Sequence, residues 1–178
     1  MISLVRTPPQ VPSSIAEQVV QLCEQGVDEP LGHQLYREAW HLRESNPRAA
    51  FVIAVAAAEI GLKKVIETLV PEAQWLLEEI QTPPFSKMLR KYIPILKVRS
   101  RITGKSILPP SGMMNLLDDA VTTRNKIIHA GAEPPNREKF SEVLDAISDF
   151  LWICDMYAGQ LKVLEFISTQ TLVAWKNE

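Results

Sequence analysis

Apolar residues recur at intervals of three and four along most of the chain, and no long stretch alternates apolar and polar residues as a strand would. That spacing places the apolar side chains on one face of a helix. Proline, glycine and asparagine residues fall between the periodic stretches, where they end one helix and begin the next. The pattern predicts an all-α protein, and 178 residues without a recognisable linker predict a single domain, 1–178.

The first part of the chain is predicted to form two helices within residues 13–45. The first begins at Ser14, where Glu17 completes a capping box, and it ends at Gly26. The second covers about 28–45. Its apolar residues are expected to face inward: Leu31, Leu35, Ala39 and Leu42.

A long apolar helix is predicted over about 47–70. Asn46 followed by Pro47 is the usual pairing of a helix N-cap with the first helical position, and Pro71 ends the helix. Through Ala58 the helix is nearly apolar on every side, so we expect it at the centre of the domain.

The next segment is less regular. A short helix is predicted from Pro71 to about residue 80, and residues 83–112, which contain several prolines, are expected to form one or two short helices and an ordered loop. Ser111 is then predicted to cap a helix that runs to 129 or 130 and ends at Gly131.

The last predicted helix begins after its N-cap, Asn136, and continues to Leu164. A wide apolar stripe indicates that it packs against other helices over most of its length. The stripe consists of Phe140, Val143, Ile147, Phe150, Cys154, Tyr157, Leu161 and Leu164. Gly159 inside this stretch is expected to mark a kink or a close helix contact.

The composition is that of a globular protein, with 46% hydrophobic and 22% charged residues. These values exclude a disordered chain, a collagen-like chain and a small disulfide scaffold. Cys23 and Cys154 are the two cysteines, and the N-terminus lacks a charged segment followed by an apolar one, so we expect a cytoplasmic protein with reduced thiols. The longest apolar run, Phe51 to Ala58, is far shorter than the ~20 residues that span a bilayer, so no membrane association is expected.

Positive charge is concentrated between Gln81 and Leu117, where no acidic residue occurs, although the net charge of the chain is −2. The basic residues of this segment are Lys87, Arg90, Lys91, Lys97, Arg99, Arg101 and Lys105. In one interpretation they bind the backbone of RNA, where each phosphate contact releases counterions, and Tyr92 stacks on a base. In the other, the segment is a solvated loop that balances an acidic surface nearby.

No motif of a common cofactor or metal site is present. The sequence lacks a Gly-rich phosphate loop, a Cys-x-x-Cys pair, a His-Glu-x-x-His helix and a Gly-x-Ser-x-Gly elbow. His33, His41 and His129 are scattered and have no thiolate or carboxylate at metal-ligand spacing, so neither a metal nor a cofactor is predicted. Cys23 and Cys154 lie on apolar faces, where buried packing is the expected role. The tryptophans are likewise expected in the core or at its edge: Trp40, Trp75, Trp152 and Trp175.

Residues 122–131 form the one cluster with chemical content. Their helix carries an apolar stripe that includes Leu117, Val121 and Ile128. Arg124 falls on the same stripe, where its charge is unfavourable without a partner. The position of this arginine therefore requires an explanation.

A polar face beside the stripe contains Thr122, Asn125 and His129. The last two are four residues apart and can contact one ligand. His129 lies in the last turn before Gly131, where the negative end of the helix dipole favours imidazolium and helps it to donate a proton. Together with Arg124, these residues have the composition of an acid and base site directed at phosphate.

A structural interpretation explains the same residues. In it, Arg124 pairs with a buried acid such as Glu59, and His129 caps the C-terminus of its helix. Spacing alone does not decide between the two, because Arg37 and His41 are also close together on one helix.

The stretch from Arg124 to His129 resembles the signature of HEPN domains (higher eukaryote and prokaryote nucleotide-binding), which has an arginine, usually a polar neighbour, and a histidine after four to six positions. Family members also place an apolar helix with an internal acid upstream, as in residues 54–63 with Glu59, and a long helix after the motif. The resemblance covers a core of about 47–168, and only the short motif is specific. The helices within 13–45 are additional.

The resemblance implies a helical bundle that forms a homodimer, with the motifs of two subunits meeting at one composite site. It also implies metal-independent RNA cleavage in active members, whereas other members bind nucleotides or protein partners without catalysis. The family's arginine, polar residue and histidine correspond to Arg124, Asn125 and His129, and Glu59 and Lys126 are supporting candidates. Toxin–antitoxin or phage-defence systems, with an antitoxin-like partner, are settings that the resemblance suggests.

Two functional hypotheses follow. In the first, a homodimeric endoribonuclease uses the 2′-hydroxyl of RNA as the nucleophile, with His129 moving protons, Arg124 holding phosphate oxygens and the segment 81–117 binding the backbone. Because Arg124 and His129 are about 140° apart around an ideal helix, a second copy would complete the site. In the second, the chain is a catalytically silent module for dimerisation or for binding a nucleotide or partner, and Arg124 is structural.

Overall fold

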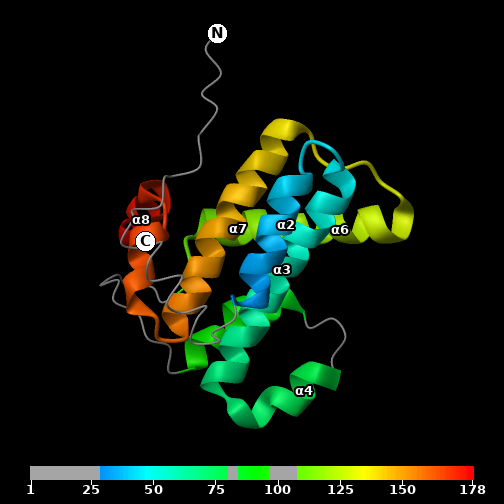
Figure 1. Cartoon of the computed structure of the whole chain (residues 1–178). Coiled ribbons are helices and arrows are strands. Elements are labelled where there is room, and N and C mark those ends of the chain that lie inside the picture. Colours follow the sequence, from blue (N-terminus) through cyan, green and yellow to red (C-terminus); the bar gives the residue numbers. More distant parts are fainter. Residues whose placement is uncertain (1–28, 80–83, 97–107) are drawn as a thin grey trace.

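A computed structural model describes residues 29–79, 84–96 and 108–178, and within these ranges the chain is helical and has no strand (Figure 1). The α-helices are α2 (Leu31–Leu42), α3 (Pro47–Leu69), α4 (Gln74–Glu79), α5 (Phe85–Lys87), α6 (Ser111–Ala130), α7 (Arg137–Tyr157) and α8 (Thr169–Lys176). Shorter 3-10 and π turns are η1 (Pro71–Ala73), η2 (Met88–Tyr92), η3 (Ile93–Ile95) and η4 (Leu161–Phe166). The all-α prediction is confirmed for this part of the chain. The predicted helix from Ser14 to Gly26 lies outside the described residues.

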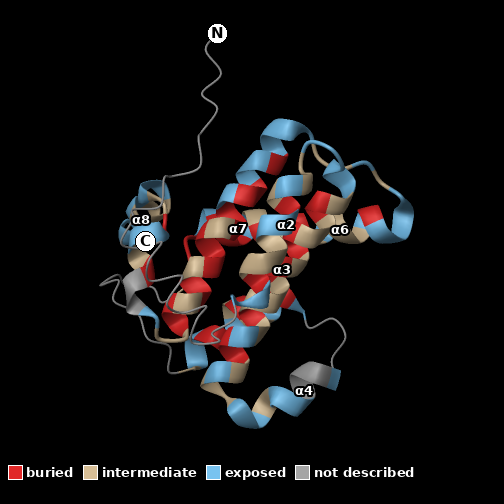
Figure 2. Ribbon diagram, viewed as in Figure 1, coloured by how far each residue is buried: buried red, intermediate tan, exposed pale blue. Residues whose placement is uncertain are grey.

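Helix α3 lies at the centre, with α2 and α7 beside it and α6 crossing it (Figure 1). It begins as predicted: Pro47 is its first residue, and the Asn46 side chain accepts a hydrogen bond from the Ala49 backbone N–H at 3.1 Å. Buried residues such as Phe51 and Leu62 occur along its length, and the buried faces of the helices meet around it (Figure 2). The predicted central position of this helix is confirmed.

Helices α2 and α3 approach each other closely because small residues lie between them. A Cβ atom added at Gly32 would lie 3.2 Å from the Ala57 carbonyl oxygen and 3.0 Å from Leu151 Cδ2. Helix α2 is shorter than predicted, and Ala39 is buried, but the prediction that Leu31 faces inward is wrong, since Leu31 is exposed at the first position of the helix. The first turn of α2 therefore packs against its neighbours through Gly32 rather than through Leu31.

Helix α6 ends where the sequence predicts. Gly131 adopts the left-handed conformation at φ 64°, which glycine reaches without strain, and backbone N–H groups after the helix bond to the Lys126 carbonyl. At the other end the prediction of a Ser111 cap is wrong, because Ser111 is already the first helical residue. Its backbone N–H and hydroxyl instead donate to the side-chain carboxylate of Glu178, which lowers the pKa of Glu178.

Helix α7 begins after Asn136, whose side chain accepts from the Lys139 N–H at 2.9 Å, as predicted. It ends at Tyr157, so the prediction of one helix to Leu164 is wrong. Gly159 has φ 109°, a conformation that stops the helix, and the chain continues through η4 to α8, an element that was not predicted. The apolar stripe continues across the break because η4 also packs on the core.

Of the remaining packing predictions, most are confirmed and one is wrong. Cys154 and Trp175 are buried, and Trp152 packs against the core, stacking on Phe166 with ring centroids 4.7 Å apart. Trp40 also lies against the core, whereas Trp75 on α4 is exposed, contrary to expectation. No helix in the described ranges is both long and apolar enough to cross a membrane.

Candidate functional site

The contact between α3 and α6 joins two of the predicted site residues. Arg124 Nη2 on α6 donates a hydrogen bond to Glu59 Oε1 on α3, and the two side chains are 13% and 19% exposed. The Nε atom of Arg124 is buried and has no hydrogen-bond partner among the described residues. The pairing of Arg124 with Glu59, which the structural interpretation anticipates, is therefore confirmed.

Arg124 lies on the buried side of α6, as the stripe predicts, since it follows buried Leu117 by two turns and its side chain is only 13% exposed. Leu117 is buried, but Ile128 is 49% exposed, and Ile127 is buried in its place. Ile128 follows Leu117 by eleven residues, about three helical turns, so the two lie on the same side of α6. In the last turn, however, the buried residue is Ile127, and Ile128 is exposed. The predicted inward position of Ile128 is wrong.

The carboxyl group of Glu59 experiences opposing influences. Burial raises its pKa, while the Arg124 charge and hydrogen bond and the nearby charge of Lys63 lower it; the net result is a pKa above the ordinary value. The interactions with Arg124 and Lys63 therefore offset only part of the cost of burying the ionised carboxylate. A second anion at this position would compete with a carboxylate whose burial is not fully compensated.

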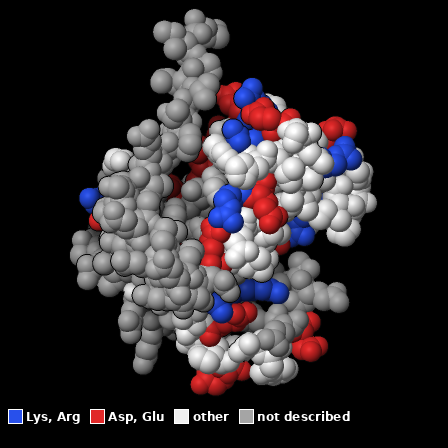
Figure 3. Space-filling model, in the orientation of Figure 1, with Lys and Arg blue, Asp and Glu red and all other residues white. Residues whose placement is uncertain are grey.

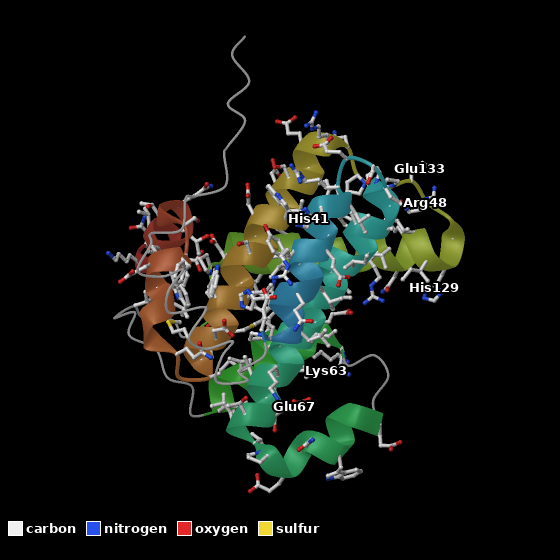
Figure 4. The ribbon with its side chains drawn as sticks, viewed as in Figure 1. His41, Arg48, Lys63, Glu67, His129 and Glu133 are labelled. Atoms are coloured by element: carbon white, nitrogen blue, oxygen red, sulfur yellow. The ribbon has the colours of Figure 1, made fainter. Side chains whose placement is uncertain are left out.

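His129 lies apart from this ion pair. Its side chain is exposed in the last turn of α6, at the free end of that helix (Figure 4). Asn125, one turn earlier, is half-buried, and Lys126 is exposed. No hydrogen bond joins His129 to Arg124 in the described part of the chain. The structure therefore brings Arg124 and Glu59 together but leaves the motif histidine facing solvent.

Three of the predicted RNA-contacting residues lie on α5 and η2, namely Lys87, Arg90 and Lys91. Arg90 donates to Asp118 Oδ2 of α6 through Nη2 at 2.9 Å and Nε at 3.1 Å, and to Asn115 Oδ1 at 2.8 Å. The charge of Arg90 is therefore paired with that of Asp118, which lies one position beyond the acid-free segment 81–117. Lys87 and Lys91 are exposed. Lys97, Arg99, Arg101 and Lys105 lie outside the described residues.

A feature that the sequence did not indicate is an apolar hollow of about 410 Å³ between the start of α3 and the end of α6. It is lined by Asn46, Arg48, Ala49, Val52, Ile53, Ile127 and Ile128. At its rim, Arg48 Nη2 of α3 lies 2.9 Å from Glu133 Oε1 in the loop that follows α6. Both residues are labelled in Figure 4. The only sequence feature that could have indicated this hollow is Ile128, an apolar residue that the periodicity assigned to the core.

The face of the molecule shown in Figure 3 carries basic and acidic side chains interleaved with uncharged ones. The described residues in this view therefore provide local sites for an anion rather than one broad basic surface. Comparisons with protein-family models, with curated proteins and with solved structures give no match.

Proposed function

We propose that the protein is a metal-independent endoribonuclease of the HEPN type, with its active site at the α3–α6 face of a homodimer. The observation that carries the proposal is that α6 holds Arg124 against Glu59 of α3, 65 residues away in the sequence, and also presents His129 to solvent five residues after Arg124. The resemblance assigns site roles to these three residues.

The chemistry needs few groups, because RNA contains its own nucleophile. The 2′-hydroxyl loses a proton and attacks the adjacent phosphorus, and the 5′-oxygen leaves with a proton, which produces a 2′,3′-cyclic phosphate. His129 is suited to move these protons, and Arg124 offers a permanent charge to the phosphate oxygens. Asn125 lies one turn before His129, where it can orient the imidazole or the leaving group.

A second copy of the chain would complete this arrangement. The exposed Ile128 adjoins His129, and the neighbouring hollow is mostly apolar. A twofold axis near the end of α6 would remove this apolar surface from water and bring one subunit's histidine toward the other's arginine. The rim residues Arg48 and Glu133 carry opposite charges, so the same rim on a partner would be complementary.

The proposal is tested by incubating purified protein with mixed RNA in EDTA and reading cleavage on a gel. We expect cleavage by the wild type, with 2′,3′-cyclic phosphate ends, and at least a hundredfold loss in His129→Ala and Arg124→Ala. His41→Ala is the matched control, since His41 is an exposed histidine in the last turn of α2. Full activity of both motif variants would rule the proposal out.

A second candidate function is a catalytically silent dimerisation or binding module, and the Arg124–Glu59 bond favours it, because it gives the arginine a structural role. On this reading wild-type protein leaves RNA intact, while Arg124→Ala lowers the free energy of unfolding by roughly 1–3 kcal/mol, since Glu59 loses its partner. Unchanged thermal stability of that variant would exclude the structural role.

A further inference from the structure

The proposed site lacks a net positive charge with which to bind a phosphate. Arg124 is the only motif residue with a permanent positive charge directed at the α3–α6 contact, and its guanidinium is hydrogen-bonded to the Glu59 carboxylate. Together the two groups carry no net charge. An RNA phosphate would therefore meet a neutral pair unless another cation lies beside it.

Lys63 is placed to be that cation. It follows Glu59 by one turn of α3, so both side chains stand on the same face of the helix. Lys63 is half-buried, and its charge acts on the Glu59 carboxylate, as that of Arg124 does. Figure 4 shows Lys63 on the side of α3 on which His129 also lies.

The neighbouring Lys64 is more exposed, and it is not among the charges that act on Glu59. Its side chain is 70% exposed, and its Nζ lies 3.3 Å from Glu67 Oε2 on the same helix. One turn of α3 therefore supplies two lysines of equal charge, of which only Lys63 belongs to the group around Glu59. This pair allows the effect of position to be separated from the effect of charge.

We propose that Lys63 is a second phosphate-binding residue of the site, and that a backbone phosphate of RNA binds between Lys63 and Arg124 by displacing the Glu59 carboxylate. Naming RNA as the ligand rests on the proposed function. In the free protein Glu59 occupies the position of the anion and keeps the two cations together. When RNA binds, one phosphate takes over both charges.

Two opposite effects on binding follow. Removing Lys63 eliminates one phosphate contact, so affinity falls roughly five- to tenfold and the slope of log K against log salt decreases by about 0.7 for a single strand. Removing the charge of Glu59 eliminates the competitor, so Glu59→Gln binds more tightly than the wild type. If Lys63 served only to stabilise the Glu59 carboxylate, its removal would have no effect in the Glu59→Gln background.

The test uses a fluorescein-labelled 2′-O-methyl RNA oligonucleotide, which lacks the nucleophile and is not cleaved. Its binding to the full chain is followed by fluorescence anisotropy over a series of salt concentrations. We expect weaker binding and a smaller slope for Lys63→Ala, both alone and combined with Glu59→Gln, tighter binding for Glu59→Gln, and wild-type binding for Lys64→Ala. Lys63→Gln, which keeps most of the aliphatic stem, replaces Lys63→Ala if circular dichroism shows that the alanine variant is unfolded.

Equal affinities for Lys63→Ala and Lys64→Ala would overturn this inference, and so would a wild-type protein that does not bind the oligonucleotide. Neither result depends on catalysis. If Lys63→Ala weakens binding while wild-type protein leaves unmodified RNA intact, the phosphate site stands and the proposed nuclease function fails.

Discussion

Arg124 on α6 donates a hydrogen bond to the carboxylate of Glu59 on α3, and neither side chain is more than one-fifth exposed. The bond fastens the motif helix to the central helix of the domain. It also sets the charge that a ligand meets at this face, because the arginine is neutralised until Glu59 moves or takes up a proton. In the proposed site, stability and phosphate binding would therefore depend on the same pair of residues.

The first prediction concerns the pH dependence of that link. The pKa of Glu59 in the folded protein lies above its ordinary value, so the folded state holds the Glu59 proton more tightly than the unfolded state. The contribution of Glu59 to stability is accordingly present at low pH and is lost as pH rises through the folded pKa. Glu59→Gln cannot ionise, so its stability relative to the wild type should increase with pH across this window.

The measurement is the urea midpoint of wild type and Glu59→Gln between about pH 4 and pH 7, since ordinary glutamate titrates near pH 4.3. Glu67→Gln is a suitable control, because Glu67 makes its ion pair at the helix surface with Lys64. If the stability of Glu59→Gln relative to the wild type instead decreased as pH rises, the interaction with Arg124 would outweigh burial.

The second prediction compares two helical glycines. A Cβ atom at Gly61 of α3 would lie 2.6 Å from Leu151 Cδ2 of α7, whereas one at Gly112 of α6 meets no atom within 4 Å. We expect Gly61→Ala to lower the free energy of unfolding by about 1–2 kcal/mol, because Leu151 is buried and must shift. Gly112→Ala should raise it by about 0.5 kcal/mol through helix propensity. Urea denaturation measures both, and a Gly61→Ala variant as stable as Gly112→Ala would contradict this packing.

The third prediction concerns Asp149, a buried carboxylate of α7 that holds the start of α8. It accepts hydrogen bonds from the Ser168 N–H at 2.9 Å, the Ser168 hydroxyl at 2.5 Å and the Thr171 hydroxyl at 2.6 Å. Asp149→Ala removes all three and should lower the free energy of unfolding by about 2–4 kcal/mol. Near-ultraviolet circular dichroism should also change, since Trp175 of α8 packs edge-on against Tyr157.

The control for this experiment is Glu142→Ala on the same helix. Glu142 is exposed and pairs with Lys139 across one turn of α7, so its removal should change stability by less than about 0.5 kcal/mol. Equal effects of the two substitutions would show that Asp149 does not anchor α8.

Local signals in the sequence predicted the helix boundaries that depend on neighbouring residues. Asn46 and Asn136 cap α3 and α7 with their own side chains, and Gly131 ends α6 in the left-handed conformation. In each case the energetic preference acts within a few residues, so it can be recognised without knowing the fold. The central position of α3 followed in the same way from its apolar surface.

Features that depend on distant residues were not predictable in this way. The apolar stripe of α7 continues beyond Gly159 because η4 packs on the same core, so periodicity did not reveal the end of the helix. The hydrogen bonds between Ser111 and Glu178 join residues that are 67 positions apart in the sequence. At the site, Arg124 required a partner and Glu59 was named as a candidate, but the association of Lys63 with the pair becomes evident only when the helices are packed.

The fourth prediction follows from the exposed apolar surface beside His129. If two copies associate there, wild-type protein should sediment as a dimer and Ile128→Asp as a monomer, because a carboxylate would be buried in the interface. The substitution should leave the fold intact, since Ile128 is half exposed in the single chain. Analytical ultracentrifugation with circular dichroism measures both. Val173→Asp on the exposed face of α8 is the matched control, and a dimeric Ile128→Asp protein would place the interface elsewhere.

The fifth prediction distinguishes a composite site from two independent ones. If each site takes Arg124 from one subunit and His129 from the other, a heterodimer of Arg124→Ala with His129→Ala contains one site with both native residues and one site with neither. Each variant alone is inactive, but subunit exchange in an equal mixture should restore about a quarter of wild-type cleavage, because half of the dimers are mixed and each has one working site. Cleavage should vanish again when both variants also carry Ile128→Asp. A mixture that remains inactive although subunit exchange is verified would mean that Arg124 and His129 of the same chain act together. The exposed histidine would then have to move toward the buried ion pair within one subunit.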